Sequence, residues 1–119
     1  MSTRESGNWG ERLVADDLRA RGYTLRASQW RCRFGELDLV AERDGVLVFV
    51  EVKLRSNLQY GQPREFVTAG KQKRLRAAAL LYLTTYDLDV PARFDVAEVF
   101  TDAHHSPAHT RIEYIEDAF

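Results

Sequence analysis

The chain has 119 residues, 45% of them hydrophobic and 29% charged, with a formal net charge of −1. This length suits one domain, which we expect to span residues 1–119, and the hydrophobic fraction excludes a disordered chain. No apolar run reaches the roughly 18 residues of a membrane-spanning helix, and the single cysteine excludes an internal disulfide. We therefore expect a protein of the reducing cytoplasm with no membrane association.

The charged residues are unevenly distributed along the chain. Residues 1–86 contain 15 Lys and Arg side chains against 10 Asp and Glu, whereas residues 87–119 contain 2 against 8. A chance distribution of charged residues over the surface can produce such a difference. A basic face that meets an acidic partner is the other explanation, and both explanations stay open.

A helix is expected near the N-terminus. Over residues 8–21, apolar side chains recur at positions 9, 13, 14 and 18, which is helical spacing. Ser6 or Asn8 can cap the start of this helix, and Gly22 can end it.

Three strands are expected next. Residues 23–30 predict the first strand, and the apolar stretches 34–42 and 46–54 predict the second and third. Asp44-Gly45 between the last two is one of the strongest short signals for a two-residue hairpin turn.

The second half of the chain predicts a loop over 56–64, followed by a long helix that Thr68 can cap. Two more strands are expected, at 93–100 and 111–116. The element order is therefore α-β-β-β-α-β-β, an α/β fold.

The predicted hairpin brings two carboxylates into opposition. With Asp44-Gly45 as the turn, Asp38 lies opposite Glu51, and Glu36 lies opposite Lys53. Opposed Cβ atoms lie about 5 Å apart and like charges there repel, so a divalent cation would offset the repulsion. A solvated sheet face with a Glu36–Lys53 ion pair is the alternative.

The chemistry of such a site follows from its residue types. Asp38, Glu51 and the backbone carbonyl of Val52 are candidate ligands for Mg²⁺ or Mn²⁺. Lys53 could deprotonate an attacking water or stabilise charge on a phosphate. This combination is typical of sites that hydrolyse nucleic-acid backbones.

Further candidates lie on the two helices and near the strand ends. Glu11 could hold a second metal or a metal-bound water, or it could be a Glu that the helix dipole favours. Basic residues at the start of the long helix oppose its dipole, so phosphate contacts explain them better than helix stability does; a solvated surface is the alternative. The predicted nucleic-acid contacts are Lys71, Gln72, Lys73, Arg74, Arg55 and Arg64.

Asp38 followed by Glu51-Val52-Lys53 resembles the PD-(D/E)xK nuclease signature, although Leu37 replaces the proline of that name. A helix that carries a carboxylate, followed by a hairpin with both halves of the signature, is an arrangement similar to that of archaeal Holliday-junction resolvases. Nearly the whole chain resembles the YraN-like family of predicted endonucleases. The matching residues are Gly10-Glu11 with Ala15 and Leu18, Gly35-Glu36-Leu37-Asp38-Leu39, Phe49-Val50-Glu51-Val52-Lys53 with Arg55, Tyr60-Gly61, Lys71 with Lys73-Arg74-Leu75, and Arg93-Phe94-Asp95-Val96.

The resemblance implies a restriction-endonuclease-like α/β fold with a mixed central sheet of about five strands flanked by helices. It implies a Mg²⁺- or Mn²⁺-dependent endonuclease that hydrolyses phosphodiester bonds of DNA, branched or structured DNA included. The residues favour DNA over RNA as the nucleic acid but leave RNA open, because none of them visibly reads the 2′-hydroxyl. The catalytic residues it implies are Glu11, Asp38, Glu51 and Lys53. The alternative is a non-catalytic nucleic-acid-binding module that keeps the nuclease fold. Resolvase relatives dimerise, so both a homodimer and a monomer stay open.

Overall fold

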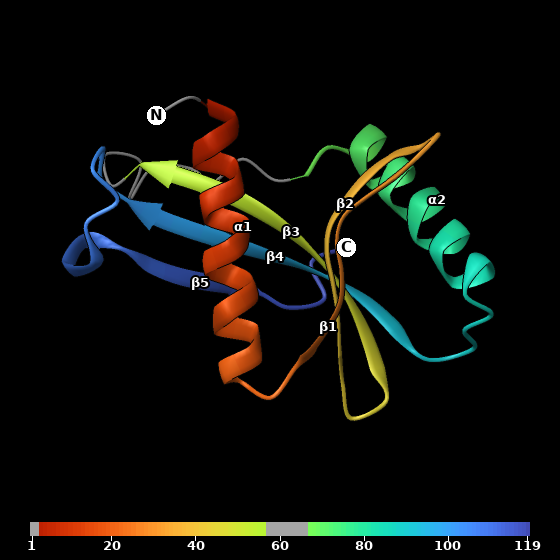
Figure 1. Ribbon diagram of the computed structural model, residues 1–119. Helices are drawn as coiled ribbons and strands as arrows, with labels where there is room; N and C mark the ends of the chain where they lie inside the picture. Colours follow the sequence, from red (N-terminus) through yellow and green to blue (C-terminus); the bar gives the residue numbers. More distant parts are fainter. Residues whose placement is uncertain (1–2, 57–66) are drawn as a thin grey trace.

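A computed structural model, which describes residues 3–56 and 67–119, shows a five-stranded sheet between two helices (Figure 1). The predicted element order and the α/β fold class are confirmed, with a short 3₁₀ turn at Pro107–His109 in addition. The elements are α1 (Thr3–Ala20), β1 (Thr24–Cys32), β2 (Gly35–Arg43), β3 (Val46–Ser56), α2 (Ala69–Thr85), β4 (Ala92–Thr101) and β5 (Arg111–Ile115).

The strands lie in the order β1-β2-β3-β4-β5, which is their order in the chain. Among the strand pairs of the described residues, only β3–β4 is parallel, and the other three pairs are antiparallel. A parallel pair needs a crossover connection, and α2 lies within the connection between β3 and β4. None of the helices in the described part of the chain is long and apolar enough to cross a membrane.

The hairpin between β2 and β3 has the predicted turn. Asp44 and Gly45 both have left-handed backbone conformations, with φ of 54° and 78°, as a two-residue hairpin turn requires. Paired residues run from Arg43 opposite Val46 to Leu39 opposite Val50, which is the predicted register.

The end of α1 and the start of α2 agree with the prediction. Gly22 ends α1 with a φ of 91°, and Thr68 caps α2 by accepting a hydrogen bond from the backbone N–H of Lys71 at 3.2 Å. However, α1 begins at Thr3, so the expectation that Ser6 or Asn8 caps its start is wrong. No proline interrupts residues 3–8, so nothing in that stretch prevents the additional turn.

Each helix covers one face of the sheet with its own hydrophobic cluster. Full burial of one large apolar side chain contributes about 1.5–3 kcal/mol to the free energy of unfolding. The contacts within each cluster therefore hold the helix on the sheet. The α1 cluster comprises Val14, Ala15, Leu18, Tyr23, Leu39, Ala41, Val48, Val50, Ala97 and Val99. The α2 cluster comprises Leu37, Val40, Leu47, Phe49, Val67, Leu75, Ala78, Ala79, Tyr82 and Val96.

The β1–β2 hairpin changes face halfway along its length. Regular alternation would place Leu37 and Leu39 on one face, yet Leu39 packs in the α1 cluster and Leu37 in the α2 cluster. Asp38 lies between them, and Gln29 occupies the facing position of β1 with a φ of 51°. The backbone is therefore kinked there, and Figure 1 shows β1 and β2 curving toward α2 while β3 continues past α1.

Candidate metal centre

The candidate site lies where β2 diverges from β3. Asp38 is the first β2 residue beyond the last pair, Leu39 with Val50. Its side chain accepts a hydrogen bond from the backbone N–H of Val52 at 2.9 Å. The Asp38 carboxylate thus accepts a hydrogen bond from the β3 backbone at the point where the paired strands separate. This hydrogen bond fixes the orientation of the Asp38 side chain.

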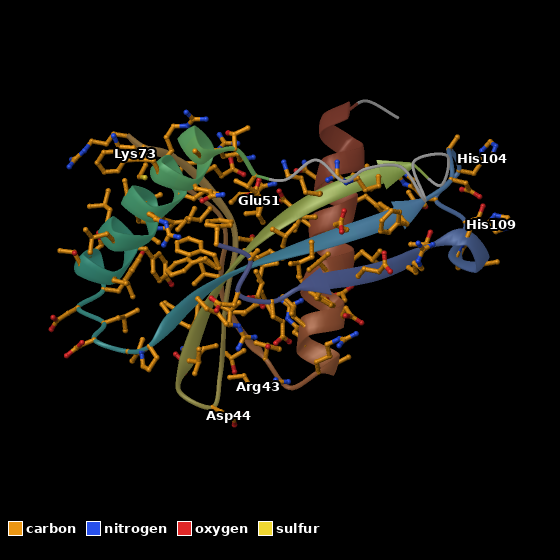
Figure 2. All side chains as sticks on the ribbon, turned by 180° about the vertical axis from the view of Figure 1, so that it is seen from behind. Arg43, Asp44, Glu51, Lys73, His104 and His109 are labelled. Atoms are coloured by element: carbon orange, nitrogen blue, oxygen red, sulfur yellow. The ribbon has the colours of Figure 1, made fainter. Side chains whose placement is uncertain are left out.

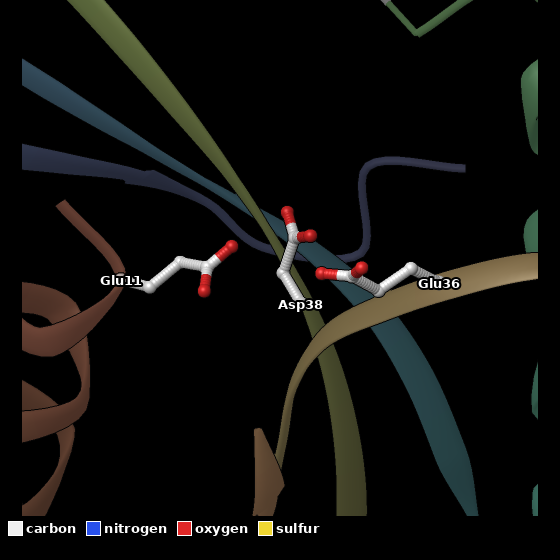
Figure 3. A group of neighbouring side chains, drawn as sticks. All are labelled: Glu11, Glu36 and Asp38. Carbon is white, nitrogen blue, oxygen red and sulfur yellow. The ribbon is translucent and has the colours of Figure 1, made fainter. Parts of the chain in front are cut away.

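Three carboxylates converge at this point. Glu11 comes from α1, whereas Glu36 and Asp38 come from β2, and one carboxylate oxygen of each lies within 4.8 Å of the others. Figure 3 shows Glu11 and Glu36 pointing toward Asp38 from opposite sides. An all-oxygen donor set of this kind fits a hard divalent cation such as Mg²⁺ or Mn²⁺.

Electrostatics within the group favour a bound cation. Burial, followed by the negative charge of Glu51, raises the pKa of Asp38 to about 8, and the charge of Glu11 acts in the same direction. Burial also raises the pKa of Glu11, with further contributions from the charges of Glu36 and Glu51. A divalent cation would stabilise the ionised carboxylates and so offset both effects.

Glu36 is the member of this group that the sequence pattern missed as a ligand. The regular hairpin placed it opposite Lys53, but in the structure its carboxylate accepts a hydrogen bond from Arg31 Nε at 3.0 Å. The kink at Asp38 carries this end of β2 away from β3 and toward α2 (Figure 1), while the Glu36 side chain points back toward Asp38 (Figure 3). No periodicity in the sequence signals that change of direction.

Glu51 lies beside the three carboxylates and pairs with a cation. Its side chain is only 8% exposed, and it forms an ion pair with Lys71 Nζ. Burial alone would lower the pKa of Lys71, but the hydrogen bond and the charge of Glu51 raise it above its ordinary value. Lys71, predicted as a nucleic-acid contact, therefore reaches the candidate site itself.

Lys53 lies two residues beyond Glu51 on β3 and is half-buried. Burial, followed by the positive charge of Lys71, lowers the pKa of Lys53. A lowered pKa increases the fraction of neutral amine that can accept a proton. Between the two side chains, Val52 uses its N–H for Asp38, and the role of its carbonyl as a ligand stays a prediction.

Two hollows border the carboxylates. One of about 590 Å³ lies between α1 and β1 and reaches Asn8, Glu11 and Gln29. The other, of about 260 Å³, lies between β2 and the start of α2. It is lined by Phe34, Gly35, Glu36, Asp38, Glu51, Lys71, Arg74, Leu75 and Ala78.

The predicted nucleic-acid contacts occupy different environments. Lys73 and Arg74 are exposed at the start of α2, and Figure 2 shows Lys73 there. Gln72 donates its side-chain amide to the carbonyl of Val67 at 2.9 Å, which holds the chain ahead of α2. Arg55 is largely buried and donates to Glu98 at 3.3 Å. Arg64 lies outside the described residues.

The sequence of the chain matches an established family. A sequence model of the Uncharacterised protein family UPF0102 matches residues 10–99, a segment that contains Glu11, Glu36, Asp38, Glu51 and Lys53. The chain belongs to this family, which confirms the YraN-like assignment.

Similar proteins in several bacteria agree with this assignment. A UPF0102 protein of Caldicellulosiruptor bescii is 39% identical over the full length of both chains. One of Syntrophomonas wolfei is 42% identical over 98% of each chain. One of Symbiobacterium thermophilum is 50% identical over 82% of this chain and 83% of its own. The similarity therefore extends over most or all of each protein.

Proposed function

We propose that the protein is a divalent-metal-dependent nuclease that hydrolyses phosphodiester bonds of DNA. The observation that carries this proposal is the convergence of three carboxylates within 4.8 Å. Glu51 lies beside them, and its charge also acts on Lys53, whose pKa is lowered. The order of Asp38 and Glu51-Val52-Lys53 along the hairpin supports it, because it resembles the PD-(D/E)xK signature. By the same resemblance, the protein is related to archaeal Holliday-junction resolvases, and branched DNA belongs among the substrates to test.

In this proposal, Glu11, Glu36 and Asp38 hold the metal, and Glu51 and the Val52 carbonyl are additional candidate ligands. When bound, Mg²⁺ or Mn²⁺ would supply the positive charge that stabilises the phosphate in the transition state and lowers the pKa of a nearby water. The Val52 N–H keeps Asp38 oriented, so little reorganisation is needed when a substrate arrives.

The side chains of the chain perform the remaining steps. The neutral amine of Lys53 takes a proton from water as the water oxygen forms a bond to phosphorus. The bond from phosphorus to the leaving oxygen breaks, and solvent protonates that oxygen. Lys71 and Arg74 line the 260 Å³ hollow next to the carboxylates, where they can stabilise the non-bridging phosphate oxygens.

DNA cleavage by the purified protein tests this function directly. We expect Mg²⁺ or Mn²⁺ to support cleavage of at least one of three labelled substrates, namely single-stranded, duplex and four-way-junction DNA, and EDTA to stop it. Failure to cleave all three with either metal would contradict the nuclease proposal. Salt-dependent DNA binding without cleavage would then favour the non-catalytic binding module.

The exposed basic residues at the start of α2 supply a separate prediction. We expect Lys73→Ala and Arg74→Ala each to weaken DNA binding about equally for all sequences and to reduce the slope of log K against log salt by about 1. The reason is that each variant removes one phosphate contact and the counterion release that accompanies it. Fluorescence anisotropy over a salt series in Ca²⁺ measures this.

Arg43→Ala is the charge-matched control for these two variants. Figure 2 shows Arg43 at the turn end of the β2–β3 hairpin, near the bottom of the view, whereas Lys73 lies at the upper left on α2. We expect its salt slope to equal that of the wild type. Equal slopes for Arg43→Ala and Lys73→Ala would rule out the α2 surface as the specific contact.

A further inference from the structure

The backbone of Gln29 has a conformation that its residue type does not favour. Gln29 has a φ of 51°, and among the described residues it is the one non-glycine with positive φ inside a strand. The others are Asp and His residues in turns or loops, and these residue types tolerate the left-handed region better. Such a conformation is strained and persists only where the surrounding structure maintains it.

The side chain of Gln29 uses this conformation to reach α1. Its amide nitrogen donates to Oδ1 of Asn8 at 2.6 Å and to Oε2 of Glu11 at 2.7 Å. Both amide hydrogens are thereby engaged, and both acceptors lie on α1, one helical turn apart. A carboxylate can only accept these hydrogen bonds, so the amide nitrogen must face Glu11.

We propose that Gln29 is a positioning residue that holds the Glu11 carboxylate against Glu36 and Asp38, and that the kink in β1 is maintained for this contact. This inference rests on the proposed function, because it assigns Gln29 a role in assembling the metal site of that reaction. Asn8 is the second anchor, since it fixes the amide plane so that the other hydrogen points to Glu11. Polar groups that orient a metal ligand typically change metal affinity about 10–100-fold.

Gln29→Asn separates this role from a purely structural one. Asparagine adopts the left-handed conformation more readily than glutamine, so the kinked backbone is retained with less strain. Its side chain keeps the amide but is one methylene shorter, so it cannot reach Glu11 and Asn8. If Gln29 only links β1 to α1, Gln29→Asn should lower the stability of the protein and leave the metal affinity of the folded molecules unchanged. If Gln29 positions Glu11, the variant should stay folded and bind the metal more weakly.

The test measures Mn²⁺ affinity by isothermal titration calorimetry and metal-free melting temperature for the full chain. We expect Gln29→Asn to bind Mn²⁺ about 10–100-fold more weakly than the wild type, while the metal-free melting temperature stays the same or rises. Asn8→Ala should show a smaller loss of affinity. The control Ser28→Ala changes the neighbouring exposed residue of β1 and should bind Mn²⁺ as the wild type does.

The outcomes distinguish this inference from the proposed function. Mn²⁺ binding that is weakened in Gln29→Asn, with no DNA cleavage by the wild type, would support the positioning role and overturn the nuclease. Cleavage by the wild type, with unchanged Mn²⁺ affinity in Gln29→Asn, would overturn the positioning role alone. Absence of Mn²⁺ binding by the wild type would overturn both.

Discussion

Asp38→Asn is expected to lower the rate of DNA cleavage by about 10³-fold while making the metal-free protein more stable at pH 8.5. Asparagine is nearly the same size, and its side-chain oxygen can still accept the hydrogen bond from the Val52 N–H. The variant therefore keeps the local geometry and removes only the charge. Activity falls because the central carboxylate of the metal group is lost.

The gain in stability follows from the raised pKa of Asp38. Its pKa is about 8 in the folded protein against 3.8 ordinarily, so between about pH 4 and pH 8 the folded state binds more protons than the unfolded state. The free energy of unfolding of the metal-free protein therefore falls as pH rises through this window, and the loss is complete above about pH 8. Asp38→Asn removes this ionisation, so the free energy of unfolding of the variant falls less over the same pH range. Urea unfolding in EDTA at pH 5 and pH 8.5 measures the free energy of unfolding of both proteins.

Asp44→Asn is the matched control for this experiment. It makes the same chemical change at a carboxylate that is 91% exposed, in a turn position where asparagine is equally suitable. We expect this variant to keep both the pH dependence of stability and the cleavage rate of the wild type. If Asp38→Asn and the wild type lost stability in parallel between pH 5 and pH 8.5, the buried ionisation of Asp38 would be disproved.

Replacement of Lys53 is expected to have the second large effect. Lys53→Ala should lower the single-turnover cleavage rate by about 10²–10⁴-fold, because the group that accepts the proton from water is removed. Binding of DNA in Ca²⁺ should change much less. The wild-type rate should rise with pH and level off once the amine is neutral, at a pH below the ordinary pKa of lysine, because burial and Lys71 lower the pKa of Lys53.

Lys53→Arg distinguishes proton transfer from simple charge stabilisation. Arginine keeps the positive charge but stays protonated, so it cannot act as the base. We expect it to be as inactive as Lys53→Ala. A rate close to that of the wild type would instead assign Lys53 the role of stabilising charge on the phosphate. Lys73→Ala, which removes an exposed cation, should leave the single-turnover rate at saturating protein unchanged.

Several features of the fold were predictable because they depend on short stretches of chain. Asp44-Gly45 favours a two-residue turn through its local conformational preferences, and that turn fixes which β2 and β3 residues face each other as far as Leu39 and Val50. Thr68 caps α2 through a hydrogen bond within one turn of the helix. The spacing of apolar residues likewise predicts the order of helices and strands.

Other features of the site depend on contacts between distant segments. The ion pair of Lys71 with Glu51 requires α2 to pack on the face of β3 that carries Glu51. The contact of Gln29 with Glu11 joins β1 to α1, 18 residues apart in the chain. Sequence periodicity does not predict these two contacts, because they depend on how the helices pack on the sheet.

For the carboxylate site, the sequence by itself determined that Asp38 lies near Glu51, since the two-residue turn fixes the register of the hairpin as far as Leu39 and Val50. Only the tertiary structure decided that Glu36 and Glu11 converge on Asp38 and that Glu51 pairs with Lys71. The physical reason is the kink at Asp38. Alternation assumes a regular strand, and packing against two helices at once bends this strand where the carboxylates meet.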